Sequence, residues 1–572
     1  MAERSLWSVG IGILKEKKPF SVEDFESNFL FEFSVEMEVS VMSSSQAKIC
    51  KTELGCRDLR SCFGKANDQN KMFSRKPNTV SFDSQISRLR KAGLRFTVKA
   101  VDSEPILEAK SSTSSKSHNR SRLFVGLPLD VVSDGTTVNQ ARAIAAGLKA
   151  LKLLGVEGVE LPVWWGVVEN EEMGKYNWSG YLAVAEMVQK AGLKLHVSLC
   201  FHASSEPKIP LPKWVVKIGE SQSSIFFTDR SGQHYQGCLS LAVDDLAVLD
   251  GKTAIQVYQD FCENFKSAFS PFIGSTITGI SMGLGPDGEL RYPSHHKPAK
   301  SGTTTGVGEF QCYDTNMLNL LKQYAEAKGN PLWGLGGPHD APTYDQPPNS
   351  NNFFNEHGGS WGSPYGDFFL SWYSSELVSH GNRLLSLASS VFGDSKVDVY
   401  GKVPLMHSWY KTRAHPSEVT AGFYNTASRD GYEAVAEIFA RNSCKIILPG
   451  MDLSDEHQPH DSFSSPELLL AQIQTTCNKH KVKVAGQNLA SGVPGGLEQI
   501  KKNMLGENPI DLFTYQRMGA HFFSPEHFPS FTEFVRSLNQ PELHPDDMPA
   551  EEVGATESVQ TSSDPNIHLQ TA

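Results

Sequence analysis

Eight short apolar segments with strand-like composition alternate with longer segments of helical period from residue 122 onward. The expected strands are 123–127, 156–163, 195–201, 277–284, 397–406, 446–453, 482–486 and 512–515. The expected helices are 143–151, 178–191, 253–267, 315–328, 365–391 and 527–538. Alternation of this kind indicates a parallel sheet, because parallel strands need crossover helices. Eight strands are also the number that closes a (β/α)₈ TIM barrel, which is the α/β fold that we predict.

Polar side chains lie at or just beyond the ends of several expected strands. They are His202, Glu289, Lys402, His407, Gln487, Asn488 and Arg517. In barrels of this type the chemistry lies on the loops that follow the carboxyl ends of the strands. Ordinary barrels also carry polar residues there, so the pattern alone is weak evidence of a functional site.

Net charge, the length of the apolar runs and the cysteine spacing each argue against a class of protein. The net charge is −11, and the part between residues 121 and 540 carries about −9 of it. An acidic body argues against a nucleic-acid partner, because phosphate binding needs a basic face. No apolar run approaches the roughly 18 residues that span a bilayer, so no membrane role is expected. The nine cysteines show neither CxxC nor Cys/His ligand spacing, which argues against a disulfide scaffold or a structural zinc site.

The composition of the two ends predicts three regions. Residues 1–120 are expected to be a disordered N-terminal region with a transit peptide, 121–540 the barrel, and 541–572 an acidic disordered tail. Residues 37–100 carry 13 Lys and Arg against five Asp and Glu, which is typical of a transit peptide. The first 36 residues are acidic, so we expect the working start at or after Met37. An ordinary disordered tail is the alternative.

Five motifs carry a resemblance to a known family. Residues 283–293, which read GLGPDGELRYP, resemble the catalytic-acid signature of the β-amylases, glycoside hydrolase family 14. Four further stretches resemble the family pattern and follow its order: 163–166, 308–314, 418–425 and 513–518. The resemblance extends over about residues 121–540 and implies a (β/α)₈ barrel, in agreement with the strand count.

The resemblance also implies an activity and roles for individual residues. β-Amylases release maltose from the non-reducing ends of α-1,4-glucans with inversion, which needs an acid and a base on opposite faces of the sugar. No metal or organic cofactor is required. Glu289 falls on the general-acid position. Positions that contact sugar in the family are retained as His202, Lys402, His407, Asn488 and Arg517.

Other parts of the machinery depart from the family pattern. The base position, glutamate in the family, is Gln487, and a neutral amide cannot accept a proton near neutral pH. The glycine-rich lid after the third strand is replaced by a shorter segment without those glycines, residues 203–214. A sugar-holding aspartate is replaced by Pro162, and Glu160, two residues earlier, is expected to lie too deep to compensate. A family threonine and glutamate align with Pro449 and Asp452.

These departures predict a catalytically inactive or strongly impaired β-amylase-like protein. It resembles the inactive plastid β-amylases of plants, which implies a non-catalytic or regulatory role in starch metabolism, in the chloroplast stroma. The expected partner is an α-glucan or a starch-metabolic protein. The alternative is a slow inverting exo-β-amylase. A third hypothesis is a metal-dependent hydrolase that uses His202, His407 and Asp452. No HxH or HExxH spacing supports it.

Overall fold

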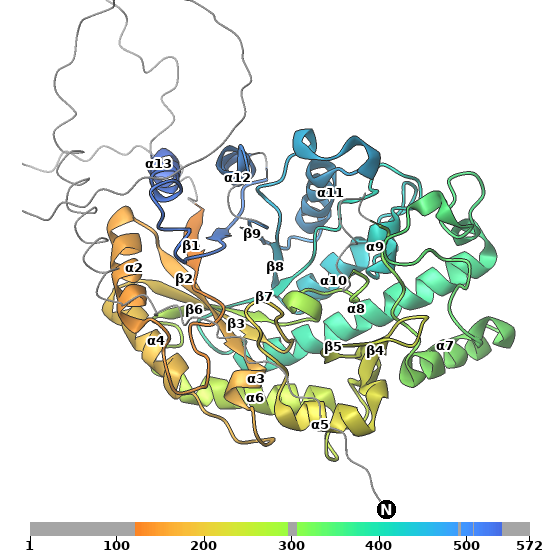
Figure 1. Cartoon of the computed structure of the whole chain (residues 1–572), viewed down its shortest axis with the longest axis horizontal. Helices are drawn as coiled ribbons and strands as arrows, with labels where there is room; N and C mark the ends of the chain where they lie inside the picture. Colours follow the sequence, from red (N-terminus) through yellow and green to blue (C-terminus); the bar gives the residue numbers. More distant parts are fainter. Residues whose placement is uncertain (1–120, 296–305, 490–492, 507, 540–572) are drawn as a thin grey trace, which may run out of the picture. The chain divides into compact units, whose positions relative to one another are not determined.

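The computed structural model describes residues 121–295, 306–489, 493–506 and 508–539 (Figure 1). The chain divides into two units, Met1–Ser117 and His118–Ala572, and every described residue belongs to the second. The predicted transit region and acidic tail therefore lie outside the described residues. Within the described part, no helix is both long and apolar enough to cross a bilayer.

Eight parallel strands form a closed barrel, which confirms the predicted fold. The strands are β1 (Arg122–Gly126), β2 (Gly158–Trp164), β3 (Lys194–Cys200), β6 (Ile277–Met282), β7 (Asp398–Lys402), β8 (Lys445–Leu448), β9 (Val484–Gln487) and β10 (Leu512–Tyr515). Around the barrel they follow the order β1-β10-β9-β8-β7-β6-β3-β2. A separate two-stranded sheet pairs β4 (Phe226–Thr228) with β5 (His234–Leu239).

Two strands end four or five residues earlier than the sequence analysis predicts. β7 stops at Lys402 and β8 stops at Leu448, although the apolar runs continue to 406 and 453. Pro404 and Pro449 follow within two residues of these ends. Proline has no N–H to donate to a neighbouring strand, so the ladder cannot continue through either position. The residues beyond each strand are thereby freed to form loops at the carboxyl end of the barrel.

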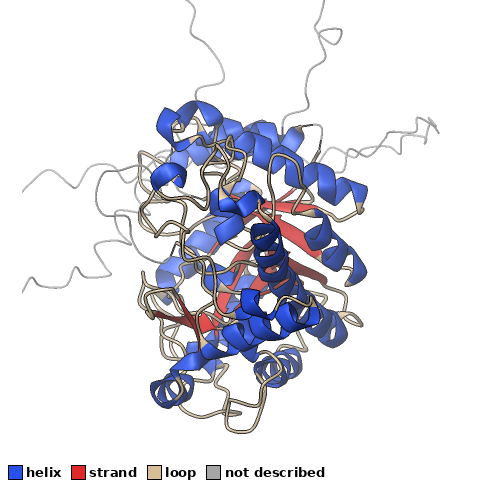
Figure 2. Ribbon diagram, turned by 90° about the vertical axis from the view of Figure 1, so that its right-hand side faces the viewer, coloured by secondary structure: helices blue, strands red, loops and turns tan. Residues whose placement is uncertain are grey.

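Helices surround the strands, as Figure 2 shows in blue and red. They are α2 (Ala141–Leu154), α3 (Trp165–Val168), α4 (Ser179–Lys190), α5 (Lys213–Ser221), α6 (Ala254–Ala268), α7 (Thr315–Ala327), α8 (Pro364–Phe392), α9 (Pro416–Thr420), α10 (Glu433–Arg441), α11 (Pro466–Lys479), α12 (Gly496–Leu505) and α13 (Phe528–Asn539). The sequence analysis missed α3, α5, α9, α10, α11 and α12. Three of these are only nine or ten residues long, and so short a window gives a weak helical period.

The strands pack on both faces. Phe124 belongs to a small buried cluster with Tyr400, Ile447, Ala485 and Leu512, all from barrel strands. Its neighbours Leu123 and Val125 belong instead to the large cluster shared with the helices. This alternation is the period of two that a strand imposes. Gly158 is required beside Phe124, because a Cβ there would lie 2.4 Å from the ring.

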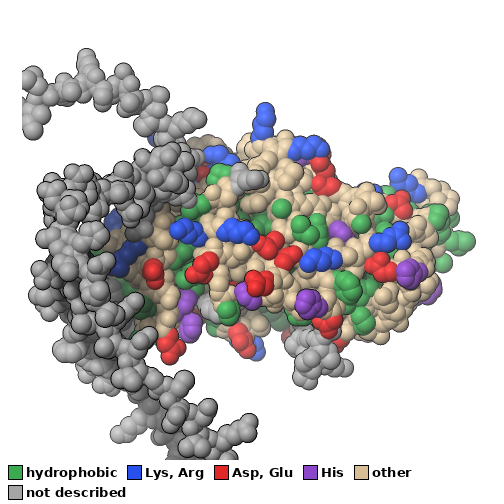
Figure 3. All heavy atoms as spheres, turned by 90° about the horizontal axis from the view of Figure 1, so that it is seen from above, with side chains coloured by type: hydrophobic (Ala, Val, Ile, Leu, Met, Phe, Trp, Pro, Cys, Tyr) green, Lys and Arg blue, Asp and Glu red, His purple; other side chains and the backbone are tan. Residues whose placement is uncertain are grey.

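Charged side chains are mixed on the face that Figure 3 displays, where lysine and arginine lie among aspartate and glutamate. The six cysteines within the described ranges are all buried and unpaired.

Candidate functional site

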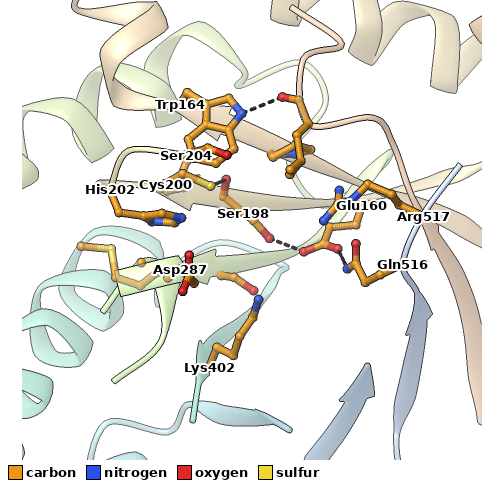
Figure 4. A pocket seen from close by; sticks show the side chains of 17 residues that line it. Glu160, Trp164, Ser198, Cys200, His202, Ser204, Asp287, Lys402, Gln516 and Arg517 are labelled. Carbon is orange, nitrogen blue, oxygen red and sulfur yellow. Dashed lines mark hydrogen bonds between the residues drawn. The ribbon is translucent and has the colours of Figure 1, made fainter. Parts of the chain in front are cut away.

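A cavity of about 220 Å³ opens at the carboxyl ends of the barrel strands (Figure 4). Its charged and histidine side chains are Glu160, His202, Asp287, Lys402 and Arg517. They come from β2, from β7 and from the loops after β3, β6 and β10. Barrel closure thus brings together segments that are distant in the sequence, at the end where barrel enzymes carry their sites.

Glu160, on β2, forms the floor of the cavity and is only 6% exposed. The Ser198 hydroxyl donates to its Oε1 at 2.6 Å. Gln516 donates from its amide to Oε2, and Figure 4 shows the two side chains in contact. The amide of Gln487 donates as well, with Nε2 3.4 Å from Oε1 and 3.5 Å from Oε2. Glu160 therefore lines the cavity, and the expectation that it does not compensate for the missing sugar-holding aspartate stays a prediction.

Positive charges stabilise this buried carboxylate. Burial alone would raise the pKa of Glu160, but the charges near it outweigh burial, and its pKa lies below the ordinary value near 4.5. The groups that lower it are Lys402, His196, Arg517 and the Ser198 hydroxyl, in that order. Burial lowers the pKa of His196 itself to about 4, so Lys402 and Arg517 supply the positive charge at neutral pH.

Lys402 and Arg517 differ in their other contacts. Arg517 donates from Nη1 to the Leu127 carbonyl oxygen at 2.8 Å, which fixes its guanidinium beside the floor. Lys402 ends β7 and lines the cavity, where its ammonium group makes no hydrogen bond or ion pair to any described residue. An ammonium group at a cavity wall without a protein partner is available to a polar ligand.

His202 lies on the cavity wall and is 7% exposed. Burial lowers its pKa to about 4, so the imidazole is neutral at neutral pH. Its Nδ1 is buried and has no hydrogen-bond partner among the described residues. The edge of the ring meets Trp164, with ring centroids 5.2 Å apart. A buried polar atom without a partner is uncommon in folded proteins and indicates a place for a ligand or water.

Glu289 follows the short turn Pro286–Gly288 after β6 and lies outside the cavity lining. Its Oε2 accepts from Nε of Arg291 at 2.8 Å, and the side chain is 14% exposed. Arg291 also pairs with Asp287. The backbone is anchored to β7, because the Leu290 N–H donates to the Lys402 carbonyl oxygen at 2.9 Å. The resemblance places the general acid here, and that role remains a prediction.

A buried ion pair holds the loop that carries Glu289. His380, on α8, donates from Nε2 to the Leu284 carbonyl oxygen at 3.0 Å. Its Nδ1 lies 2.7 Å from Asp244, and Arg383 donates to the same carboxylate oxygen from Nε at 2.8 Å and Nη2 at 2.6 Å. Asp244 is 3% exposed, so this group ties the loop to α8 from inside the protein.

β9 ends at Gln487, and Asn488 follows it directly, beside the cavity floor. The Asn488 side chain makes two hydrogen bonds to the backbone of Gln516. Its Nδ2 donates to the Gln516 carbonyl oxygen at 2.9 Å, and its Oδ1 accepts from the Gln516 N–H at 2.6 Å. It thereby positions the segment that carries Arg517. Neither Gln487 nor Asn488 lines the cavity itself. A sugar contact for Asn488 remains a prediction.

His407 is separated from this group. Its Nδ1 lies 2.6 Å from the Ser464 hydroxyl, and the residue is not part of the cavity lining. Burial lowers its pKa to about 4. Within the described ranges, no group of three His, Cys, Asp or Glu side chains could hold a metal ion. His202, His407 and Asp452 therefore form no metal site.

The segment after His202 does not have the structure of a free lid. The Ala203 N–H donates to the Gly237 carbonyl oxygen at 2.7 Å, which ties the segment to β5. Ser204 and Ile209 exchange two backbone hydrogen bonds, at 2.8 and 2.9 Å. Ile209 is also buried, at 7% exposure. Closing over the cavity would require these contacts to break.

Sequence reasoning missed Gln516, Ser198 and Ser281. Ser198 and Ser281 line the cavity, and the Ser281 hydroxyl lies 2.6 Å from Nε2 of His196. Ser198 points inward by the same period of two that places His196 and Cys200 on that face of β3. Gln516 could have been noticed as the residue before Arg517. Its contact with Glu160, 356 residues away along the chain, has no local signal.

Comparisons with known proteins agree with this geometry. The sequence model described as glycosyl hydrolase family 14 matches residues 124–542. The chain is 58% identical over 544 residues to inactive beta-amylase 9 of Arabidopsis thaliana, which covers 94% of this chain and 100% of that protein. It is 40% identical over 433 residues to beta-amylase 1, chloroplastic, of the same plant, covering 73% of this chain and 75% of that protein.

A solved structure has the same architecture. The catalytic domain of beta-amylase from Paenibacillus polymyxa superposes with a TM-score of 0.61 at 25% sequence identity. The match covers 74% of this chain and 99% of that domain.

Proposed function

The chain belongs to glycosyl hydrolase family 14 as an inactive β-amylase-like protein, and we propose that its role in starch metabolism is non-catalytic or regulatory. Inverting hydrolysis needs an acid on one side of the sugar and an ionised base on the other, with room between them for the attacking water. Each part of this requirement can be compared with the residues present.

The observation that carries the proposal is the contact between Gln487 and Glu160. At the base position an amide donates its hydrogen to a carboxylate instead of accepting a proton from water. An amide is not basic near neutral pH, and general-base assistance is worth about 10²–10⁴ in rate. Loss of the base by itself would leave a trace of activity.

Two further features support a larger loss. Pro162 lines the cavity where the family pattern has an aspartate, so no carboxylate at that position can hold a sugar hydroxyl. The segment 203–209 is tied to β5 through Ala203 and is closed on itself by the Ser204–Ile209 pair. A lid that excludes water strengthens electrostatic interactions in a site, and this segment lacks the freedom to act as one.

Features that suit a sugar ligand remain in the cavity. Lys402 has no partner among the described residues, and Nδ1 of His202 is buried without one. Hydroxyl groups of an α-glucan could satisfy both, so we propose an α-glucan end as ligand. A starch-metabolic protein is the other partner that we consider. We also propose a plastid location, since several relatives are named chloroplastic.

Reducing-sugar release from soluble starch tests the proposal directly. The purified chain should release no maltose above background, and Glu289→Gln should give the same baseline. The alternative function is a slow inverting exo-β-amylase. Steady turnover that disappears in Glu289→Gln would establish that alternative and overturn the non-catalytic role.

A further inference from the structure

The amide of Gln487 not only lacks the basicity of a carboxylate but also makes a structural contact with Glu160. Carboxylate oxygens only accept, so the amide nitrogen, and not its oxygen, faces Glu160. Nε2 lies 3.4 and 3.5 Å from the two oxygens of that carboxylate. Both residues are almost fully buried, at 3% and 6% exposure. The pair is therefore a neutral donor placed against a buried anion.

The groups around this pair carry one negative charge, on Glu160, and two positive charges, on Lys402 and Arg517. Ser198 and Gln516 are neutral donors to Glu160. Lys402 and Arg517 face it with positive charge from the other side of the barrel interior and from the loop after β10. Burial raises the pKa of Cys200 to about 12, which keeps this thiol neutral.

A second carboxylate at position 487 would lie within hydrogen-bond distance of the first. Two like charges so close in a buried site repel each other, and this raises the pKa of one carboxyl so that it keeps its proton to higher pH. The donors on the floor already serve Glu160: Ser198 lies at 2.6 Å, and Gln516 is in direct contact. The carboxyl that keeps the proton is consequently the one introduced at 487.

We propose that Glu160 holds the negative charge of the cavity floor and keeps a carboxyl introduced at position 487 protonated, so that the floor accommodates one ionised carboxylate at a time. The proposal rests on the proposed function only in taking position 487 as that of the base. It identifies a positioning residue on β2 that acts through position 487. It predicts that Gln487→Glu alone does not supply an ionised base.

Four forms of the full chain test this: the native protein, Glu160→Gln, Gln487→Glu, and the double variant Glu160→Gln/Gln487→Glu. The measurement is urea unfolding between pH 5 and 8. A carboxyl whose pKa is raised on folding stabilises the protein at low pH and loses that effect as pH rises. Gln487→Glu should therefore lose up to about tenfold in its folding equilibrium constant per pH unit relative to the native chain.

The double variant moves the negative charge from position 160 to position 487. It should fold with near-native stability and show no extra loss with rising pH. Ser198→Ala combined with Gln487→Glu is the matched control, because it removes a hydrogen bond to Glu160 and leaves the charge in place. That control should retain the proton uptake. Measured as a difference from the native chain, an additional infrared band of a protonated carboxyl should appear in Gln487→Glu and be absent from the double variant.

If Gln487→Glu unfolds at neutral pH, recovery of the folded state by the added Glu160→Gln gives the same reading. The proposal is overturned if the single variant shows no pH-dependent loss, or if the double variant shows the same loss. Neither result depends on activity. Maltose release by the native chain would overturn the non-catalytic role and leave this titration result standing.

Discussion

Gln487 and Glu160 are 327 residues apart in the chain, yet the amide of one lies 3.4 Å from the carboxylate of the other. β2 and β9 are separated by β1 and β10 in the barrel order, so the two side chains meet across the barrel interior. The contact joins the residue at which the resemblance places the family's base to a carboxylate on β2. Changes in either residue should therefore affect both folding stability and chemistry.

Replacement of Glu160 should lower the free energy of unfolding, by more when the new side chain removes the hydrogen-bond acceptor than when it removes only the charge. Glu160→Leu leaves Ser198, Gln487 and Gln516 without an acceptor, and an unsatisfied buried donor costs about 1–3 kcal/mol. Glu160→Gln keeps an acceptor oxygen and loses only the charge, so its cost should be smaller. Chemical denaturation at pH 7 measures both. Equal stability of Glu160→Leu and the native chain would contradict the role of this network.

The pH dependence of stability should report the burial of His407. Its pKa is about 4 in the folded protein, whereas an unfolded histidine titrates near 6.5. Between these values the unfolded state binds the extra proton, so the free energy of unfolding falls as pH drops from 6.5 toward 4. One group contributes at most about 1.4 kcal/mol per pH unit.

His407→Gln should make the profile flatter in that pH window. Ser464→Ala is the matched control: it removes the hydrogen bond partner of Nδ1, at 2.6 Å, and keeps the imidazole. Its stability should be lower at all pH values, with the slope unchanged. If the free energy of unfolding depends on pH as steeply in His407→Gln as in the native chain, other groups account for the proton uptake.

Maltose should stabilise the native chain if the cavity holds a glucan end. Ligand at ten times its Kd adds about 1.4 kcal/mol to the free energy of unfolding by mass action. Lys402→Met should weaken this effect, because it removes an ammonium group on the cavity wall that has no partner among the described residues. Thermal melting with and without millimolar maltose measures it, and cellobiose tests the linkage. No shift in the native chain would favour a protein partner over sugar binding.

Two adjacent aspartates offer a matched test of the ion pair that anchors α8 to the loop of Glu289. Asp244 is 4% exposed at its side chain and pairs with His380 and Arg383, whereas Asp245 is 72% exposed and lies 3.6 Å from Arg383. Breaking a buried pair costs about 3–5 kcal/mol, so Asp244→Ala should lose that much stability. Asp245→Ala should change it by less than about 0.5 kcal/mol. Similar losses of stability in both variants would show that burial of the ion pair does not determine its contribution to stability.

Much of the fold could be predicted because its signals are local. The strand over 512–515 coincides with β10, and the long helix over 365–391 lies within one residue of α8 at each end. Predictions failed where a local signal is misleading or weak. The apolar runs after Lys402 and Leu448 continue, but a proline in each ends the sheet ladder. Short helices such as α10 and α12 offer too few turns for a period to stand out.

The structure brings some of the residues that the sequence singles out into one cavity, and their roles there stay predictions. His202, Lys402 and Arg517 were expected in one cavity and line it together. Glu160 was assigned to a deeper layer from strand period alone, which fixes the face of a side chain but not how far a long side chain reaches.

Sequence by itself determined that this chain forms an eight-stranded barrel and that residue 487 is an amide where the resemblance places the base, since strand period, motif order and residue identity are all written along the chain. Only the tertiary structure decided what that amide does. A hydrogen bond between β2 and β9 depends on barrel closure, which sets the distance between side chains from opposite ends of the chain. The charge of Glu160 likewise follows from Lys402 and Arg517, which only the closed barrel brings near it.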